Sequence, residues 1–192
     1  MEKNEIARSC QVLVIGGSAG SLEVLMKVFP KLRNDLLFPI VVVLHRKSGS
    51  DSSLSDLFST RTSLGVKEIE DKQTLVPGHI YIAPADYHVL FENMVMLSID
   101  FSEKVNYSRP SIDVTFESAA EIIGRNLVGL ILSGANDDGA GGIKKIKQHG
   151  GVAAVQDPAT AESPYMPLQV LLSVTPDAIL KTDEIAEFIN SL

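Results

Sequence analysis

The chain has 192 residues, of which 45% are hydrophobic and 21% charged, as is ordinary for a folded globular protein. Its formal net charge of −7 argues against a nucleic-acid-binding protein, because such proteins present basic surfaces to phosphates. The single cysteine, Cys10, excludes an intrachain disulfide and a cysteine-based metal site. The length predicts one domain over residues 1–192.

The sequence offers no sign of export or membrane insertion. Its first ten residues, MEKNEIARSC, lack the apolar core of a signal peptide. No apolar run approaches the roughly 18 residues that a membrane-spanning helix needs. We therefore expect a cytoplasmic protein.

Short apolar runs, each followed by a glycine- or serine-rich turn, alternate along the chain with segments of helical periodicity. Such runs fit parallel strands that are covered on both faces. Residues 182–184 resemble a helix start, with Thr182 as the N-cap. The alternation predicts an α/β fold, a doubly wound, mainly parallel sheet in a Rossmann-like three-layer arrangement. In chain order the predicted strands cover residues 11–15, 40–44, 127–132 and 152–155, and the predicted helices residues 21–29, 54–58, 114–123 and 142–148.

One region interrupts this alternation. Residues 77–84, 89–91 and 95–99 have the composition of short strands, and residues 92–94 form a turn between the last two. We expect an antiparallel excursion at one edge of the sheet.

The first predicted strand leads into Gly16-Gly-Ser-Ala-Gly20 and then into a helix. This matches G-x-S-x-G, the nucleophile elbow, in its strand–turn–helix context. Ser18 is then the candidate nucleophile, held in strained backbone, and the Ala19 amide is a candidate oxyanion donor. A glycine-rich turn of this kind can also bind the phosphates of a nucleotide, and the turn alone favours neither function.

His45 favours the hydrolase. Of the four histidines it alone directly follows a strongly predicted parallel strand. Active sites of open α/β sheets form at the carboxyl ends of the strands, so His45 and Ser18 should emerge at the same edge. This makes His45 the candidate general base.

A carboxylate should complete the site by fixing the orientation of the imidazole. Asp137 and Asp138 follow the predicted strand at 127–132, and either could serve, or could instead cap the next helix. The order serine, histidine, aspartate differs from the serine, aspartate, histidine order of α/β-hydrolases.

These residues resemble the chemotaxis protein-glutamate methylesterases, the CheB family. The family's G-A-S-T-G-G corresponds to residues 16–21, its Q-H-M-P to residues 44–47, and its L-T-G-M-G-x-D-G to residues 132–139. Two further stretches, residues 77–84 with His88 and residues 109–113, resemble P-G-x-x-Y-I-A-P…H and R-P-S-x-D. The matches span nearly the whole chain in order.

The resemblance implies a Ser18–His45–Asp138 triad, with Asp138 chosen over Asp137 by its alignment with D-G. It implies backbone oxyanion donors, for which Ala135 occupies the methionine position of the motif. It also implies hydrolysis of γ-glutamyl methyl esters on the cytoplasmic helices of chemoreceptors, deamidation of receptor glutamines, and no cofactor or metal. His79 and His88 are interpreted as structural.

Two departures from the family pattern affect regulation and substrate choice. Family members usually carry an N-terminal receiver domain, whereas about ten residues precede the first predicted strand here, so we do not expect phosphorylation in cis to control this chain. Ala19, Arg46 and Lys47 replace residues next to the nucleophile and the base. These replacements leave a second hypothesis, a non-catalytic docking module with the same fold.

Overall fold

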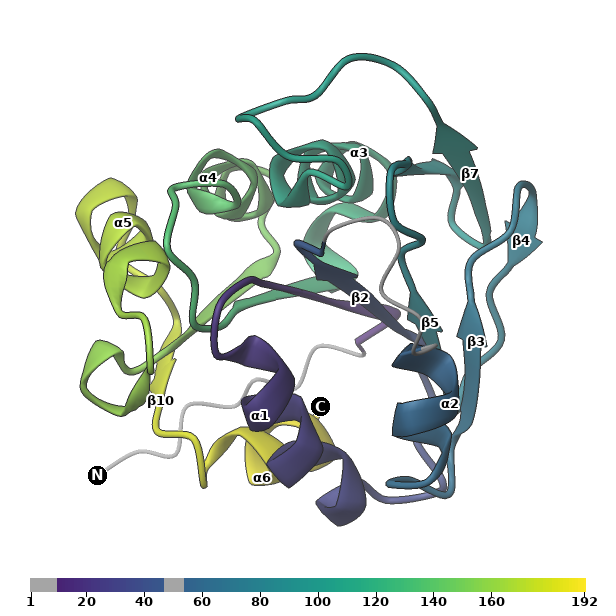
Figure 1. The fold of residues 1–192 in the computed structure, drawn as a ribbon, viewed down its shortest axis with the longest axis horizontal. Helices are drawn as coiled ribbons and strands as arrows, with labels where there is room; N and C mark the ends of the chain where they lie inside the picture. Colours follow the sequence, from purple (N-terminus) through teal and green to yellow (C-terminus); the bar gives the residue numbers. More distant parts are fainter. Residues whose placement is uncertain (1–9, 47–53) are drawn as a thin grey trace.

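The computed structural model describes residues 10–46 and 54–192. Its main feature is a seven-stranded parallel sheet with the order β10-β9-β8-β1-β2-β5-β3 (Figure 1). The strands are β1 (Val12–Gly17), β2 (Ile40–Leu44), β3 (Gly65–Glu68), β5 (His79–Ile82), β8 (Leu127–Ile131), β9 (Val152–Gln156) and β10 (Ala178–Leu180).

Helices cover both faces of this sheet, which confirms the doubly wound α/β prediction. α1 (Ser21–Val28), α2 (Leu54–Ser59) and α6 (Ile185–Asn190) lie on one side, and α3 (Ile112–Ile123), α4 (Ala140–Gln148) and α5 (Tyr165–Ser173) on the other (Figure 1). Three short 3-10 turns, η1 (Phe29–Lys31), η2 (Gly124–Asn126) and η3 (Pro158–Thr160), follow α1, α3 and β9.

The continuous apolar strands supply both hydrophobic cores at once. Along β1, Leu13 and Ile15 pack with α1 and α6, while Val12 and Val14 pack with α3, α4 and α5. This follows from the two-residue repeat of a strand, which sends successive side chains to opposite faces. Because every residue of β1, β2, β8 and β9 is buried, the centre of the sheet holds its carboxyl-terminal loops on a rigid base.

The antiparallel excursion is present as a second sheet of three strands, in the order β4 (Gln73–Thr74), β7 (Met96–Asp100), β6 (His88–Asn93). β6 and β7 form the expected hairpin. One assignment needs refinement, because β5 pairs in parallel with β2 and β3 and so belongs to the main sheet. The short, half-exposed β3 carried too little pattern to predict this pairing.

Two details of the predicted helices were wrong or missing. Thr182 does not cap the last helix, α6, which begins at Ile185. In the turn before α6 the Lys181 N–H donates to the Glu184 carboxylate at 2.8 Å. The Thr182 hydroxyl instead accepts a hydrogen bond from the Gln156 side chain. α5 was not predicted, because Pro167 reads as a helix breaker, yet it lies in the first turn, where proline is tolerated. From the sequence, Asp51 or Ser52 could cap α2, and both positions lie outside the described residues.

Candidate active site

Three adjacent strands bring the predicted site residues to one edge of the sheet. β1 pairs with β2 on one side and with β8 on the other. Ser18 directly follows β1, His45 directly follows β2, and the loop after β8 carries Asp138. The His45 N–H donates to the Gly17 carbonyl at 3.1 Å, so the base and nucleophile candidates are joined through the backbone.

The turn that carries Ser18 depends on two glycines. Gly20 has a φ of 81°, a left-handed conformation that glycine adopts without steric cost. A Cβ on Gly17 would lie 2.1 Å from the Ser21 hydroxyl oxygen, so the turn could not close over a larger residue. Ser18 lies outside helix and strand but is not among the residues with positive φ, so our expectation of strained backbone at Ser18 itself was wrong. The glycine two residues later adopts the unusual conformation in its place.

Buried polar side chains fasten this turn to the loop after β8. The Ser18 N–H donates to the Ser133 carbonyl at 2.9 Å and to the Ser21 hydroxyl at 3.1 Å. Ser21 in turn donates to the Ser133 carbonyl at 2.6 Å, and the Ser133 hydroxyl donates to the Ala19 carbonyl at 2.7 Å. Gln156 at the end of β9 accepts from the Ser133 N–H. Sequence reasoning missed these positioning residues; their one signal is that polar side chains stand at the ends of apolar runs.

His45 and Asp138 form the strongest side-chain contact of the site. His45 Nε2 lies 2.7 Å from Asp138 Oδ2, and the Asp138 side chain is fully buried. The carboxylate also accepts hydrogen bonds from Ser111 Oγ, the Ile112 N–H and the Asp113 N–H. Burial by itself raises the pKa of Asp138, but the bonds from His45 and from these donors outweigh it and hold that pKa below its usual value. Asp138 is therefore an ionised partner for the ring.

The other ring nitrogen of His45, Nδ1, faces the side chain of Asn136. Asn136 Nδ2 lies 3.3 Å from His45 Nδ1. Asn136 also accepts from the Asp138 N–H through Oδ1, which directs its amide nitrogen at the imidazole. In the described part of the chain the half-buried Ser18 hydroxyl makes no hydrogen bond to His45. Such contacts are often long in unliganded enzymes and tighten when substrate binds. Asn136 was not singled out from the sequence.

The two residues whose N–H groups are candidate oxyanion donors, Ala19 and Ala135, are exposed. Within residues 10–46 and 54–192, neither the Ala19 nor the Ala135 N–H donates to another protein group. The neighbouring Gly134 N–H, by contrast, donates to the Ser163 carbonyl at 3.0 Å.

Asp137, the residue before Asp138, has a different environment from its neighbour. Asp137 is exposed and neither caps α4 nor contacts His45; the N-cap of α4 is Gly139, with no side-chain cap. Asp113 on α3 instead accepts hydrogen bonds at the start of α4, from the N–H groups of Gly139 and Gly142 at 2.9 and 2.6 Å. Burial, with a contribution from the nearby Asp138 charge, raises the pKa of Asp113 to about 6.

The remaining candidate groups take structural roles. His88 is buried between the Glu103 carbonyl and the Ser111 N–H, at 2.9 and 3.1 Å, and His79 packs against Gly65 and Tyr81. Burial raises the pKa of the Cys10 thiol to about 12, which leaves it unreactive. The described residues contain no cluster of three or more metal-ligating side chains, and none of their helices has the length and hydropathy to cross a bilayer.

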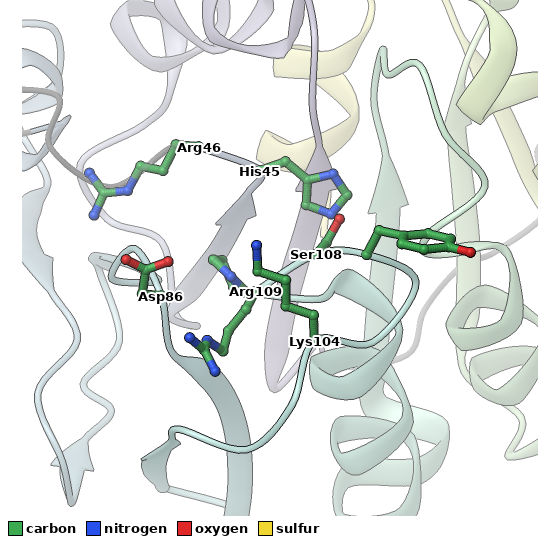
Figure 2. A pocket seen from close by; sticks show the side chains of 8 residues that line it. His45, Arg46, Asp86, Lys104, Ser108 and Arg109 are labelled. Atoms are coloured by element: carbon green, nitrogen blue, oxygen red, sulfur yellow. The ribbon is translucent and has the colours of Figure 1, made fainter.

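A cavity of about 610 Å³ opens beside His45 (Figure 2). Segments far apart in the sequence line it, namely the end of β2, the turn before β6 and the loop that leads into α3. Its lining residues are His45, Arg46, Asp86, Lys104, Tyr107, Ser108, Arg109 and Pro110.

The comparisons with known proteins agree on one family. The sequence profile of the CheB methylesterases matches residues 13–189. A Leptospira interrogans protein, named provisionally as a protein-glutamate methylesterase/protein-glutamine glutaminase, is 42% identical over 92% of each chain. A Thermotoga maritima protein-glutamate methylesterase/protein-glutamine glutaminase is 35% identical over 94% of this chain, which spans 54% of that relative.

The fold is similar to a solved structure. The crystal structure of the Thermotoga maritima CheB methylesterase catalytic domain superposes with a TM-score of 0.90 at 34% sequence identity. The match covers 95% of this chain and 98% of that domain.

Proposed function

Since this chain belongs to the CheB methylesterase family, we propose that it is a carboxylic ester hydrolase that removes methyl groups from γ-glutamyl methyl esters. Its substrates on this proposal are the methylated cytoplasmic helices of chemoreceptors. The observation that best supports the proposal is the 2.7 Å contact between His45 and the buried carboxylate of Asp138. His45 directly follows β2, the strand that pairs with the one before Ser18.

In the proposed reaction Ser18 is the nucleophile and His45 the base. Because Nε2 of His45 faces Asp138, Nδ1 is the nitrogen left to accept the Ser18 proton, after the Asn136 amide moves away. Ser18 Oγ then bonds to the ester carbonyl carbon. The developing oxyanion accepts hydrogen bonds from the N–H groups of Ala19 and Ala135, neither of which donates to a described residue.

Collapse of the tetrahedral intermediate breaks the carbon–oxygen bond to the methoxy group, which leaves as methanol with the proton from His45. A water molecule then gives its proton to Nδ1 and attacks the acyl-enzyme, releasing glutamate and restoring Ser18. Asp138 keeps the proton on Nε2 and stabilises the imidazolium in each step. The same steps with ammonia as the leaving group would deamidate glutamine, the second activity in the names of the relatives.

The proposal predicts that Ser18→Ala abolishes hydrolysis of a glutamyl methyl ester peptide and labelling by a fluorophosphonate probe. Methanol release measures the first and in-gel fluorescence the second. The variant should unfold at the same temperature as the wild-type chain, because the half-buried Ser18 side chain makes no hydrogen bond within the described residues. Equal hydrolysis by both proteins, or a wild-type chain that neither hydrolyses the ester nor reacts with the probe, would refute the esterase assignment.

A further inference from the structure

The cavity beside His45 is cationic, although the protein as a whole carries a net charge of −7. Its lining contains three cations, Arg46, Lys104 and Arg109, against one carboxylate, Asp86. Arg46 is partly neutralised, because it donates to Glu68 at 2.5 Å. The remaining positive charge is supplied by Lys104 and Arg109.

Lys104 is the most available of these groups. It is exposed, extends into the cavity in Figure 2, and makes no hydrogen bond or ion pair with any residue that the structure describes. A lysine ammonium group carries three donors and no acceptor, and no residue that the structure describes uses any of the three.

Arg109 is held in place at the cavity wall. Its Nη1 donates to the Ser102 carbonyl at 2.6 Å, and its guanidinium lies 3.9 Å from the centre of the Phe101 ring. These contacts fix the cation without neutralising it, since neither a carbonyl nor a ring removes its charge. The buried Nε–H groups of Arg109 and Arg46 have no acceptor in the described part of the chain. Because these nitrogens are buried, a ligand in the cavity would instead meet the Lys104 ammonium group and the terminal nitrogens of Arg109.

We propose that this cavity is a carboxylate subsite, which binds an acidic side chain that flanks the scissile ester in the substrate protein. The identity of the ligand rests on the proposed function, because that reaction converts neutral esters into glutamates. A substrate with several esters therefore gains carboxylates next to its remaining esters as hydrolysis proceeds. The subsite lies beside His45, so a segment with its ester at Ser18 would present a neighbouring carboxylate to Lys104 and Arg109. The enzyme thus favours acidic, partly hydrolysed segments over neutral ones.

Two labelled helical peptides test this subsite. Both carry one glutamyl methyl ester, and the positions one helical turn before and after it hold glutamate in one peptide and glutamine in the other. Binding is measured by fluorescence anisotropy with the Ser18→Ala variant, so that turnover does not interfere. We expect the acidic peptide to bind about fivefold more tightly at low salt, the scale of one or two new charge-assisted contacts. At 0.5 M NaCl, where screening acts within several ångströms, the preference should fall to about twofold or less.

Substitutions in the same Ser18→Ala background assign the preference to the cavity. Lys104→Gln should remove most of it, and Lys104→Glu should reverse it. The matched control is Lys31→Gln, which makes the same charge change at an exposed residue of η1, outside the cavity and beyond the carboxyl end of α1. The control should keep the full preference.

Equal binding of the two peptides, or a preference that survives both Lys104 substitutions, would overturn the subsite. Failure of the proposed function looks different. The wild-type chain would then hydrolyse neither peptide, while the binding measurements would still decide for or against the carboxylate subsite.

Discussion

Replacing Asp138 with asparagine tests the proposed triad most directly. The carboxylate accepts hydrogen bonds from five donors, and the two shortest, His45 Nε2 at 2.7 Å and the Ile112 N–H at 2.6 Å, share Oδ2. The other oxygen, Oδ1, accepts from Ser111, Asp113 and Asn106. An asparagine side chain has one oxygen and one NH2 group, so its NH2 group must face hydrogen-bond donors on one side of the site.

Two consequences follow, one for catalysis and one for stability. If the NH2 group faces His45, the ring loses the acceptor that keeps its proton on Nε2. The proton then sits on Nδ1, which can no longer act as the base. The corresponding substitution in serine proteases lowers kcat by about 10⁴, and we expect a loss of at least about a hundredfold here. Leaving one or two buried donors unpaired should also lower the free energy of unfolding by about 2–4 kcal/mol.

Asp137→Asn is the matched control, because it removes the same charge one residue away. Asp137 is exposed, and its side chain makes no hydrogen bond within the described residues. The control should therefore retain most of the activity and unfold at the wild-type temperature. Methanol release from an ester peptide gives kcat, and circular dichroism gives the fraction folded at the assay temperature. An inactive Asp137→Asn would show that the assignment is off by one residue, and full activity in both variants would show that His45 needs no carboxylate.

Two further predictions concern the neighbours of this pair. Asn136→Ala removes the 3.3 Å contact that competes for His45 Nδ1. Because such bonds are of modest strength, kcat should stay the same or rise by up to about threefold. A hundredfold fall in kcat would instead make Asn136 part of the catalytic machinery. The pKa of Asp113 is raised to about 6, so between about pH 4 and 6 the folded chain binds more protons than the unfolded chain, and stability falls as the pH rises. Urea unfolding should show the wild-type chain losing about 1–3 kcal/mol relative to Asp113→Asn between pH 4 and 7, and a constant difference would contradict the raised pKa.

The sequence by itself determined the parts of this protein that depend on local patterns. Buried parallel strands appear in the sequence as continuous apolar runs, and the predicted strand at 40–44 matches β2 residue for residue. The elbow glycines and the position of His45 after its strand then place Ser18 and His45 at one sheet edge, because neighbouring parallel strands end together. The choice of Asp138 came from the motif, since either adjacent aspartate satisfied the composition.

Only the tertiary structure decided what depends on residues far apart in the chain. Asp138 meets His45 at Nε2, and the N-terminus of α3 holds the same carboxylate through Ser111, Ile112 and Asp113. The raised pKa of Asp113 also depends on tertiary structure, because burial and the nearby charge of Asp138 both raise it. The cationic cavity likewise joins the end of β2 to the loop before α3, a loop whose path no periodicity specifies. Loop conformation is set by the surfaces against which a loop packs, and the order of residues in one segment carries little information about surfaces supplied by another.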